Sequence, residues 1–193
     1  RPPIHQSSIT ASHYALDSHA VRKREEGRVH LDGFLSYPSA VYTVPYGVMV
    51  PKEVGNLLLP VPVSGSHIGF STLRMEPCWM AMGQAAGIAS ALSIDGKVKV
   101  QNIDLSRLQD KLVDQKATLM YFKDVDYTSP HFRMVQYLGL RGYLPEWTAR
   151  LQEPVDMATL TAWKKLSGKD LPGIEAGKTT RLVALEMIYR KIK

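Results

Sequence analysis

Three side chains of this sequence have the chemistry of proton transfer or anion binding: His19, His67 and Arg74. A histidine can move a proton near neutral pH, and His19 lies two residues after Asp17, as a substrate-side acid–base pair would require. Arg74 can hold an anionic group through its fork of N–H donors. Each candidate also has a structural interpretation: His67 as a hydrogen-bonding residue of a turn, Asp17–His19 as a turn network, and Arg74 as an ion-pair partner.

Other kinds of chemistry have little support. Cys78 is the only cysteine, so an intrachain disulfide and a cysteine-based metal site are excluded. The sequence has no zinc-binding histidine spacing, no nucleophile elbow and no phosphate-binding loop. The net charge is +6, yet the one dense basic cluster, Arg22–Arg24, is typical of a solvated turn. We therefore expect no metal, no nucleic-acid partner and no membrane span.

Residues 64–90 combine a polar turn, a segment predicted to be extended, and a helix rich in small residues. Gly83 and Gly87 lie inside that helix, where each costs about 1 kcal/mol relative to alanine. Such a cost indicates that something approaches the backbone closely, either another element or a ligand. As a ligand site, the start of the helix would favour negative charge through its dipole. Cys78 lies beside it and is interpreted as packing.

The remaining pattern predicts an α+β chain with two parts, residues 1–118 and 119–193. Short strands and turns are expected over 17–46, including Val41–Val44, and a short buried strand at Leu57–Leu59. No regular period is evident in residues 1–16. Helices are expected over residues 77–94, 104–116, 130–141, 154–167 and 179–192, with Asp104 and Asp156 near two of the starts.

The first part resembles the C-terminal portion of a family of bacterial FAD-dependent oxidoreductases, some of which carry a xanthan lyase label. The resemblance lies in a set of short elements that occur in family order over about residues 12–118. One departure is Gly47, where the family often carries arginine. The elements are Asp17–Val21, Val44–Lys52, Asn56–Leu58, Ser64–His67, Leu73–Pro77 and Gly83–Gly87.

This resemblance implies an oxidoreductase with FAD as cofactor. It places the turn and the helix beside the isoalloxazine ring, with Ser66, Gly83, Gln84, Ala85 and Gly87 as cofactor-binding positions. Its Gly-x-Gly-x-x-Gly element for the ADP half is missing here, and the chain begins at Arg1 without methionine. We therefore expect a fragment that is inactive alone, whose partner is the N-terminal Rossmann portion of the same protein. A small-molecule or sugar-like substrate and self-association through the exposed cofactor face are further expectations.

The second part resembles an S-layer homology module. The features are Phe122, Asp124 and Val125, followed by Leu140–Tyr143 at the end of a helix, and Thr179–Tyr189 resembles the second-helix half of another repeat. The Thr-Arg-Ala-Glu step of true modules reads Asp156–Thr159 here, which favours a structural or docking role. The alternative function for the whole chain is a non-catalytic polysaccharide or cell-wall binding module. The sequence leaves the localisation open, with bacterial export as one option.

Overall fold

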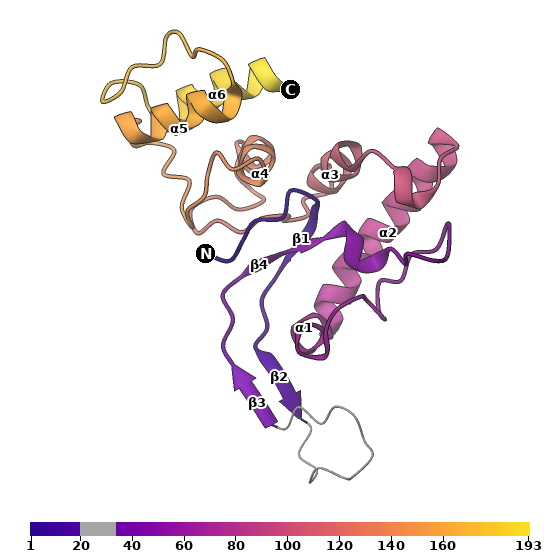
Figure 1. Cartoon of the computed structure of the whole chain (residues 1–193). Helices are drawn as coiled ribbons and strands as arrows, with labels where there is room; N and C mark the ends of the chain where they lie inside the picture. Colours follow the sequence, from indigo (N-terminus) through magenta and orange to yellow (C-terminus); the bar gives the residue numbers. More distant parts are fainter. Residues whose placement is uncertain (20–33) are drawn as a thin grey trace, which may run out of the picture. The chain divides into compact units, whose positions relative to one another are not determined.

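The computed structural model describes residues 1–19 and 34–193, with the backbone alone at positions 18, 19 and 34. The predicted basic turn at Arg22–Arg24 lies outside these residues. They form two compact units: an N-terminal unit of residues 2–119, and a C-terminal unit of residues 120–193 together with Arg1. Strands occur in the first unit and helices in both, so the chain has the α+β fold that the sequence predicts (Figure 1).

Two antiparallel strand pairs run along one side of the N-terminal unit. Strand β1 (Ser8–Ser12) pairs with β4 (Tyr42–Pro45), and β2 (Leu16–His19) pairs with β3 (Phe34–Tyr37). A register shift between Ser8 and Thr10 bends the first pair, as an extra residue in one strand does. A short 3₁₀ turn, η1 (Tyr46–Met49), follows β4.

Strand β1 was not predicted, because its buried residues include polar ones. Ser8 is fully buried, and its hydroxyl donates to the carbonyl of Leu119 at 2.7 Å. The side-chain amide of Gln109 donates to the Ser8 carbonyl at 3.0 Å. These bonds satisfy polar groups that would otherwise be costly to bury, and they allow a strand without the usual apolar alternation.

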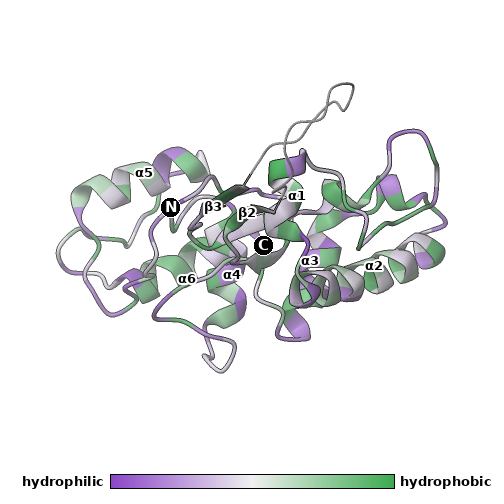
Figure 2. Ribbon diagram, turned by 90° about the horizontal axis from the view of Figure 1, so that it is seen from below, coloured by the Kyte–Doolittle hydropathy of each residue, from purple (hydrophilic) through white to green (hydrophobic). Residues whose placement is uncertain are grey.

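Helix α2 (Glu76–Gly96) confirms the predicted small-residue helix and packs against β1 and α3 (Leu105–Asp114). Its mainly pale and green colouring in Figure 2 reflects small and apolar residues. Its buried positions recur at intervals of three or four residues, which places them on one face of a helix. They are Cys78, Met82, Ala85, Ala89 and Leu92. The 3₁₀ turn η2 (Val100–Asn102) then leads to α3, whose start Asp104 caps as predicted.

Two local predictions are wrong. The segment before α2 is not extended but forms helix α1 (His67–Leu73), which begins where Ser66 accepts a hydrogen bond from the amide of Gly69 at 3.0 Å. Residues 57–59 form no strand; there the amide of Leu59 donates to the carbonyl of Met49 at 2.8 Å. Prolines 60 and 62 follow immediately and prevent further ladder bonds.

The C-terminal unit contains the three remaining predicted helices, α4 (Phe132–Leu140), α5 (Met157–Ser167) and α6 (Arg181–Ile192), and α4 packs against α6. The side chain of Gln136 on α4 pairs with both backbone groups of Met120 at 2.8 Å. Asp156 caps α5 by accepting a hydrogen bond from the Thr159 amide at 2.8 Å, as predicted.

Candidate active site

The predicted site residues lie along α1, α2 and the short connection between these helices, residues 74–75, which we call the elbow. Ser66 and His67 are exposed at the start of α1, and Arg74 lies at its end. Seven helical residues separate these positions by about 10 Å, so His67 and Arg74 do not form one cluster. The side chain of His19 lies outside the described residues.

Arg74 is anchored by a buried carboxylate. Its Nη2 donates to Oδ2 of Asp17 at 2.8 Å, and the hydroxyl of Tyr14 donates to the same oxygen at 3.0 Å. Asp17 is 8% exposed and Arg74 is 34% exposed, and the guanidinium carbon lies 5.5 Å from the centre of the Tyr14 ring. Arg74 is therefore an ion-pair partner, one of its two interpretations, and the ion pair fixes β2 to the end of α1.

A pocket of about 250 Å³ opens beside this network. It lies between the end of β1 with the two residues that follow it and the first turn of α2. The sequence did not indicate this pocket, because β1 was not predicted. Its lining carries hydroxyl, imidazole and thiol groups but no carboxylate and no lysine or arginine. The lining residues are Ala11, Ser12, His13, Tyr14, Met75, Pro77 and Cys78.

The thiol of Cys78 in this pocket is protonated rather than nucleophilic. Burial raises the pKa of Cys78, and the neighbouring Ser12 hydroxyl only partly offsets that effect. Burial also raises the pKa of the adjacent Tyr42 phenol, which donates to the Thr72 carbonyl at 2.9 Å. A thiol with a raised pKa reacts slowly, so the pocket offers hydrogen bonds and not a covalent nucleophile.

The outer face of α2 is open and apolar, opposite its buried face. A Cβ built on Gly83 or Gly87 meets no atom within 4 Å, so close packing by another part of the described chain does not explain these glycines. Met80 and Ile94 flank them on the same face and are 75% and 76% exposed. The predicted position Ala85 instead faces the core.

Gln84 lies at the edge of this outer face. Its side-chain amide donates to the side-chain oxygen of Gln115 at 2.8 Å. The four predicted cofactor positions on α2 therefore separate into an open pair, Gly83 and Gly87, an edge residue, Gln84, and an inward residue, Ala85.

The first turn of α2 has few free donors. Pro77 has no N–H, and the amides of Cys78 and Trp79 both donate to the Met75 carbonyl, at 3.0 and 3.2 Å. The carboxylate of Glu76 lies in the same turn, where it already interacts with the positive end of the helix dipole. This turn therefore offers few free groups to an anion.

The open outer face of α2 and the neutral pocket are separate features of the N-terminal unit, because Cys78 in the pocket lining belongs to the buried face of the helix. Residues 3–112 match the sequence profile of the family described as FAD dependent oxidoreductase. The match covers more than half of the chain and includes β1, the elbow and α2. The chain therefore belongs to the FAD dependent oxidoreductase family, whose cofactor is FAD. No curated protein and no solved structure matches the chain.

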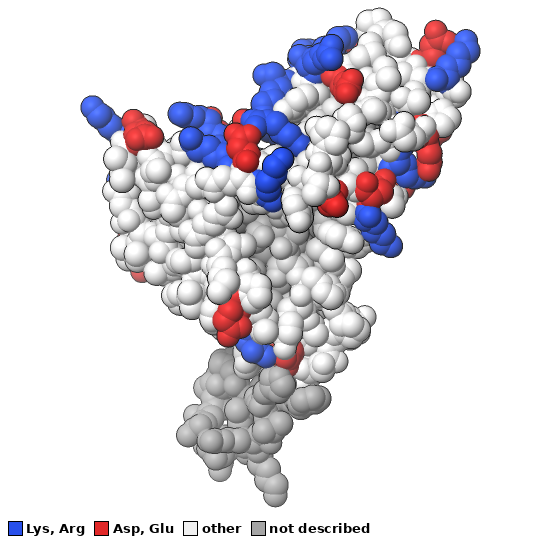
Figure 3. Space-filling view, turned by 180° about the vertical axis from the view of Figure 1, so that it is seen from behind, with Lys and Arg blue, Asp and Glu red and all other residues white. Residues whose placement is uncertain are grey.

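Residues 1–19 and 34–193 contain no helix that is both long and apolar enough to span a membrane. Within the same ranges, no three His, Cys, Asp or Glu side chains gather in a way that could hold a metal ion. On the face seen in Figure 3, acidic side chains lie among the lysines and arginines.

Proposed function

We propose that the N-terminal unit supplies the isoalloxazine side of the FAD site of a flavin-dependent oxidoreductase. The observation that carries this proposal is the open face of α2 at Gly83 and Gly87, within the segment that matches the family. Glycine lacks a Cβ, so a planar ring can approach the helix backbone directly. Met80, one turn before Gly83 on the same face, would cover one edge of that ring.

FAD, when bound, supplies the acceptance of a hydride equivalent from the substrate. The pocket beside the elbow is separate from the ring site, because Cys78 in its lining belongs to the buried face of α2, opposite Gly83 and Gly87. Its uncharged lining favours a small hydroxylated compound, and His13 is exposed there and can exchange a proton with it. Arg74 and Asp17 would hold the pocket wall rigid, and His19 and His67 remain proposed catalytic groups.

The ADP half of the cofactor needs a partner segment. No Gly-x-Gly-x-x-Gly sequence occurs in these 193 residues, so we assign that contact to a Rossmann portion of the same protein. The chain alone would then bind flavin only through the ring and would not turn over. Without that Rossmann portion, the open apolar face of α2 would favour self-association.

A comparison of two flavins tests this proposal. Riboflavin shares the ring system with FAD but lacks ADP. If the chain binds only the ring, it should quench the fluorescence of both flavins with similar affinity. We expect dissociation constants within about threefold of each other. An FAD affinity about a hundredfold tighter would show that the ADP site is inside this chain, and no binding of either flavin at about 1 mM would overturn the ring site.

For the C-terminal unit we propose a structural or docking role of the S-layer homology type. Arg181 begins α6 after Thr180, but it is only 4% exposed and its Nε donates to the Ala149 carbonyl at 2.9 Å. Its guanidinium also lies 5.3 Å from the buried Trp163 ring. A residue used in this way stabilises the unit and is poorly available to a cell-wall polymer.

The second candidate is a non-catalytic module that binds a polysaccharide or the cell wall. One observation favours it, a pocket of about 430 Å³ inside the C-terminal unit. A chain that binds sugars and no flavin would support this candidate over the first.

A further inference from the structure

The loop that precedes α5 forms a pocket in the C-terminal unit. The pocket has a volume of about 430 Å³ and lies between residues 148–153 and the segment from Asp124 to His131. This volume is within the range of sites for small ligands, about 300–1,000 Å³. Nothing in the flavin proposal involves this part of the chain.

The pocket walls are held in place before any ligand arrives. Both carboxylate oxygens of Asp124 accept backbone hydrogen bonds, from Ala149 and from Arg150, at 2.8 Å. On the other side, the amide of Leu182 donates to the Leu151 carbonyl, and the amide of Arg181 to the Glu153 carbonyl, also at 2.8 Å. A loop without regular structure is thus fixed on both flanks, as expected of a preformed site.

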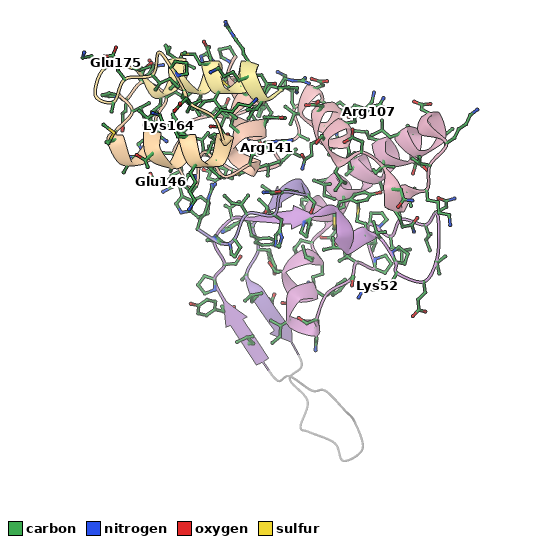
Figure 4. All side chains as sticks on the ribbon, turned by 45° about the horizontal axis from the view of Figure 1, so that its top comes forward. Lys52, Arg107, Arg141, Glu146, Lys164 and Glu175 are labelled. Carbon is green, nitrogen blue, oxygen red and sulfur yellow. The ribbon has the colours of Figure 1, made fainter. Side chains whose placement is uncertain are left out.

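Arg150 is the unusual residue of this loop. Its φ of +51° is in the left-handed region, which costs a non-glycine residue of order 1 kcal/mol or more. Its terminal nitrogens pair with Glu146 and, at 3.7 Å, with Glu153; Figure 4 labels Glu146. Its buried Nε has no hydrogen-bond partner among the described residues. Strain and an unsatisfied donor at one pocket residue are typical of functional positions.

The lining disfavours an anionic ligand. It contains two carboxylates, on Asp124 and Glu153, and one guanidinium, so that an anion meets a surplus of negative charge. The other polar groups are the side chains of Ser129, His131, Thr148 and Gln152, which together both donate and accept hydrogen bonds. Hydroxyl groups of a ligand match such a mixed set.

We infer that this pocket binds a small polyhydroxylated molecule of the size of one sugar ring, without negative charge. The inference gives the glycan-binding candidate a specific site. It rests on that candidate only for the class of ligand. Polar contacts come from the loop, and Val125 and Leu151 supply the apolar floor. A small turn of the Arg150 guanidinium toward the ligand would give its Nε an acceptor.

Three probes of one ring size test the charge argument: glucose, glucuronate and glucosamine. Backbone amide shifts of the ¹⁵N-labelled chain report binding, and we expect the amides of residues 148–153 to move with glucose, with a dissociation constant of about 1 mM. Glucuronate should bind at least several-fold more weakly than glucose, and glucosamine at least as tightly as glucose, because the lining carries two carboxylates and one guanidinium. Tighter binding of glucuronate, or no shift with glucose at about 50 mM, would overturn the inference.

A matched pair of variants locates the site. Thr148→Val removes a hydroxyl that lines the pocket, and we expect it to weaken glucose binding several-fold without changing the melting temperature. Thr161→Val makes the same change at an exposed position of α5 and should leave binding unaltered. Equal effects of the two variants would show that the sugar binds elsewhere. Flavin titrations of the same samples keep the FAD proposal separate, because that site is in the other unit.

Discussion

Replacing the two outer-face glycines of α2 by alanine separates stability from cofactor binding. Gly83→Ala and Gly87→Ala place a methyl group where no atom of the described chain lies within 4 Å. Both positions have helical backbone, so alanine fits without strain. The fold of the described chain therefore does not require glycine at either position, and any loss caused by alanine should appear in ligand binding.

The magnitude follows from helix propensity. Each replacement should stabilise the N-terminal unit by about 0.5–1 kcal/mol, because alanine loses less backbone entropy than glycine. Together the two changes should raise the free energy of unfolding by about 1–2 kcal/mol, which corresponds to a few degrees in melting temperature. Flavin affinity should fall in the same variants, since the added methyl groups hold the ring away from the backbone.

Urea unfolding and riboflavin titration measure the two effects on one sample. Gly96→Ala is the matched control: it lies in the last turn of the same helix, and its added Cβ makes an ordinary 3.5 Å contact with Val98. This control should raise stability modestly and leave flavin binding unchanged.

Two results would refute the reasoning. A double variant less stable than the parent would mean that the outer face of α2 is not open. A more stable double variant that binds riboflavin as tightly as the parent would mean that the glycines do not contact the ring. The control protects against a general effect of alanine in this helix.

Three further substitutions test contacts and ionisation inside each of the two units. Gly139→Ala should destabilise the C-terminal unit by about 1–3 kcal/mol in urea unfolding, because the new Cβ would lie 2.9 Å from the Phe122 ring; an unchanged midpoint would contradict this. Arg74→Met should cost about 1–3 kcal/mol by leaving the buried Asp17 carboxylate without its cation, with Arg74→Lys losing less. Burial raises the pKa of Tyr46 to about 12. The unfolded phenol ionises near 10, so the stability that Tyr46 provides is complete below pH 10 and is lost as the pH rises through 12. Its loss should reach about 2–3 kcal/mol, and Tyr46→Phe should flatten this part of the stability profile.

Helices were predictable from sequence because their signals are local. Asp104 and Asp156 cap α3 and α5 with their own side chains, within three residues of the amides that they bond. Gly142, expected to end α4, has a φ of +87° and donates to the Gly139 carbonyl. Such features depend on a few consecutive residues and very little on the rest of the fold.

The pocket beside the elbow was not predictable in the same way. It requires the residues that follow β1 to meet the first turn of α2, more than sixty positions later in the chain. His13 and Tyr14 carry no local motif, and the polar residues of β1 concealed the strand that positions them. The pairing of β1 with Tyr42–Pro45 would have indicated this strand. The pocket could then have been predicted from the residues at the end of the strand.

Because the open glycines lie away from the start of α2, we expect charge at the start of this helix to have little effect on flavin affinity. An anion-stabilising helix start would need free amides, but here the amides of Cys78 and Trp79 donate to Met75 and Glu76 brings a negative charge. Glu76→Gln should therefore alter riboflavin affinity by less than about threefold, while it lowers stability by about 0.3–1 kcal/mol through the lost dipole interaction. A tenfold gain in riboflavin affinity would indicate that the ring lies at the helix start after all, close enough for its charge distribution to be repelled by the carboxylate. Unchanged affinity in Glu76→Gln, with reduced affinity in Gly87→Ala, would place the ring on the glycine face, where shape rather than charge selects the ligand.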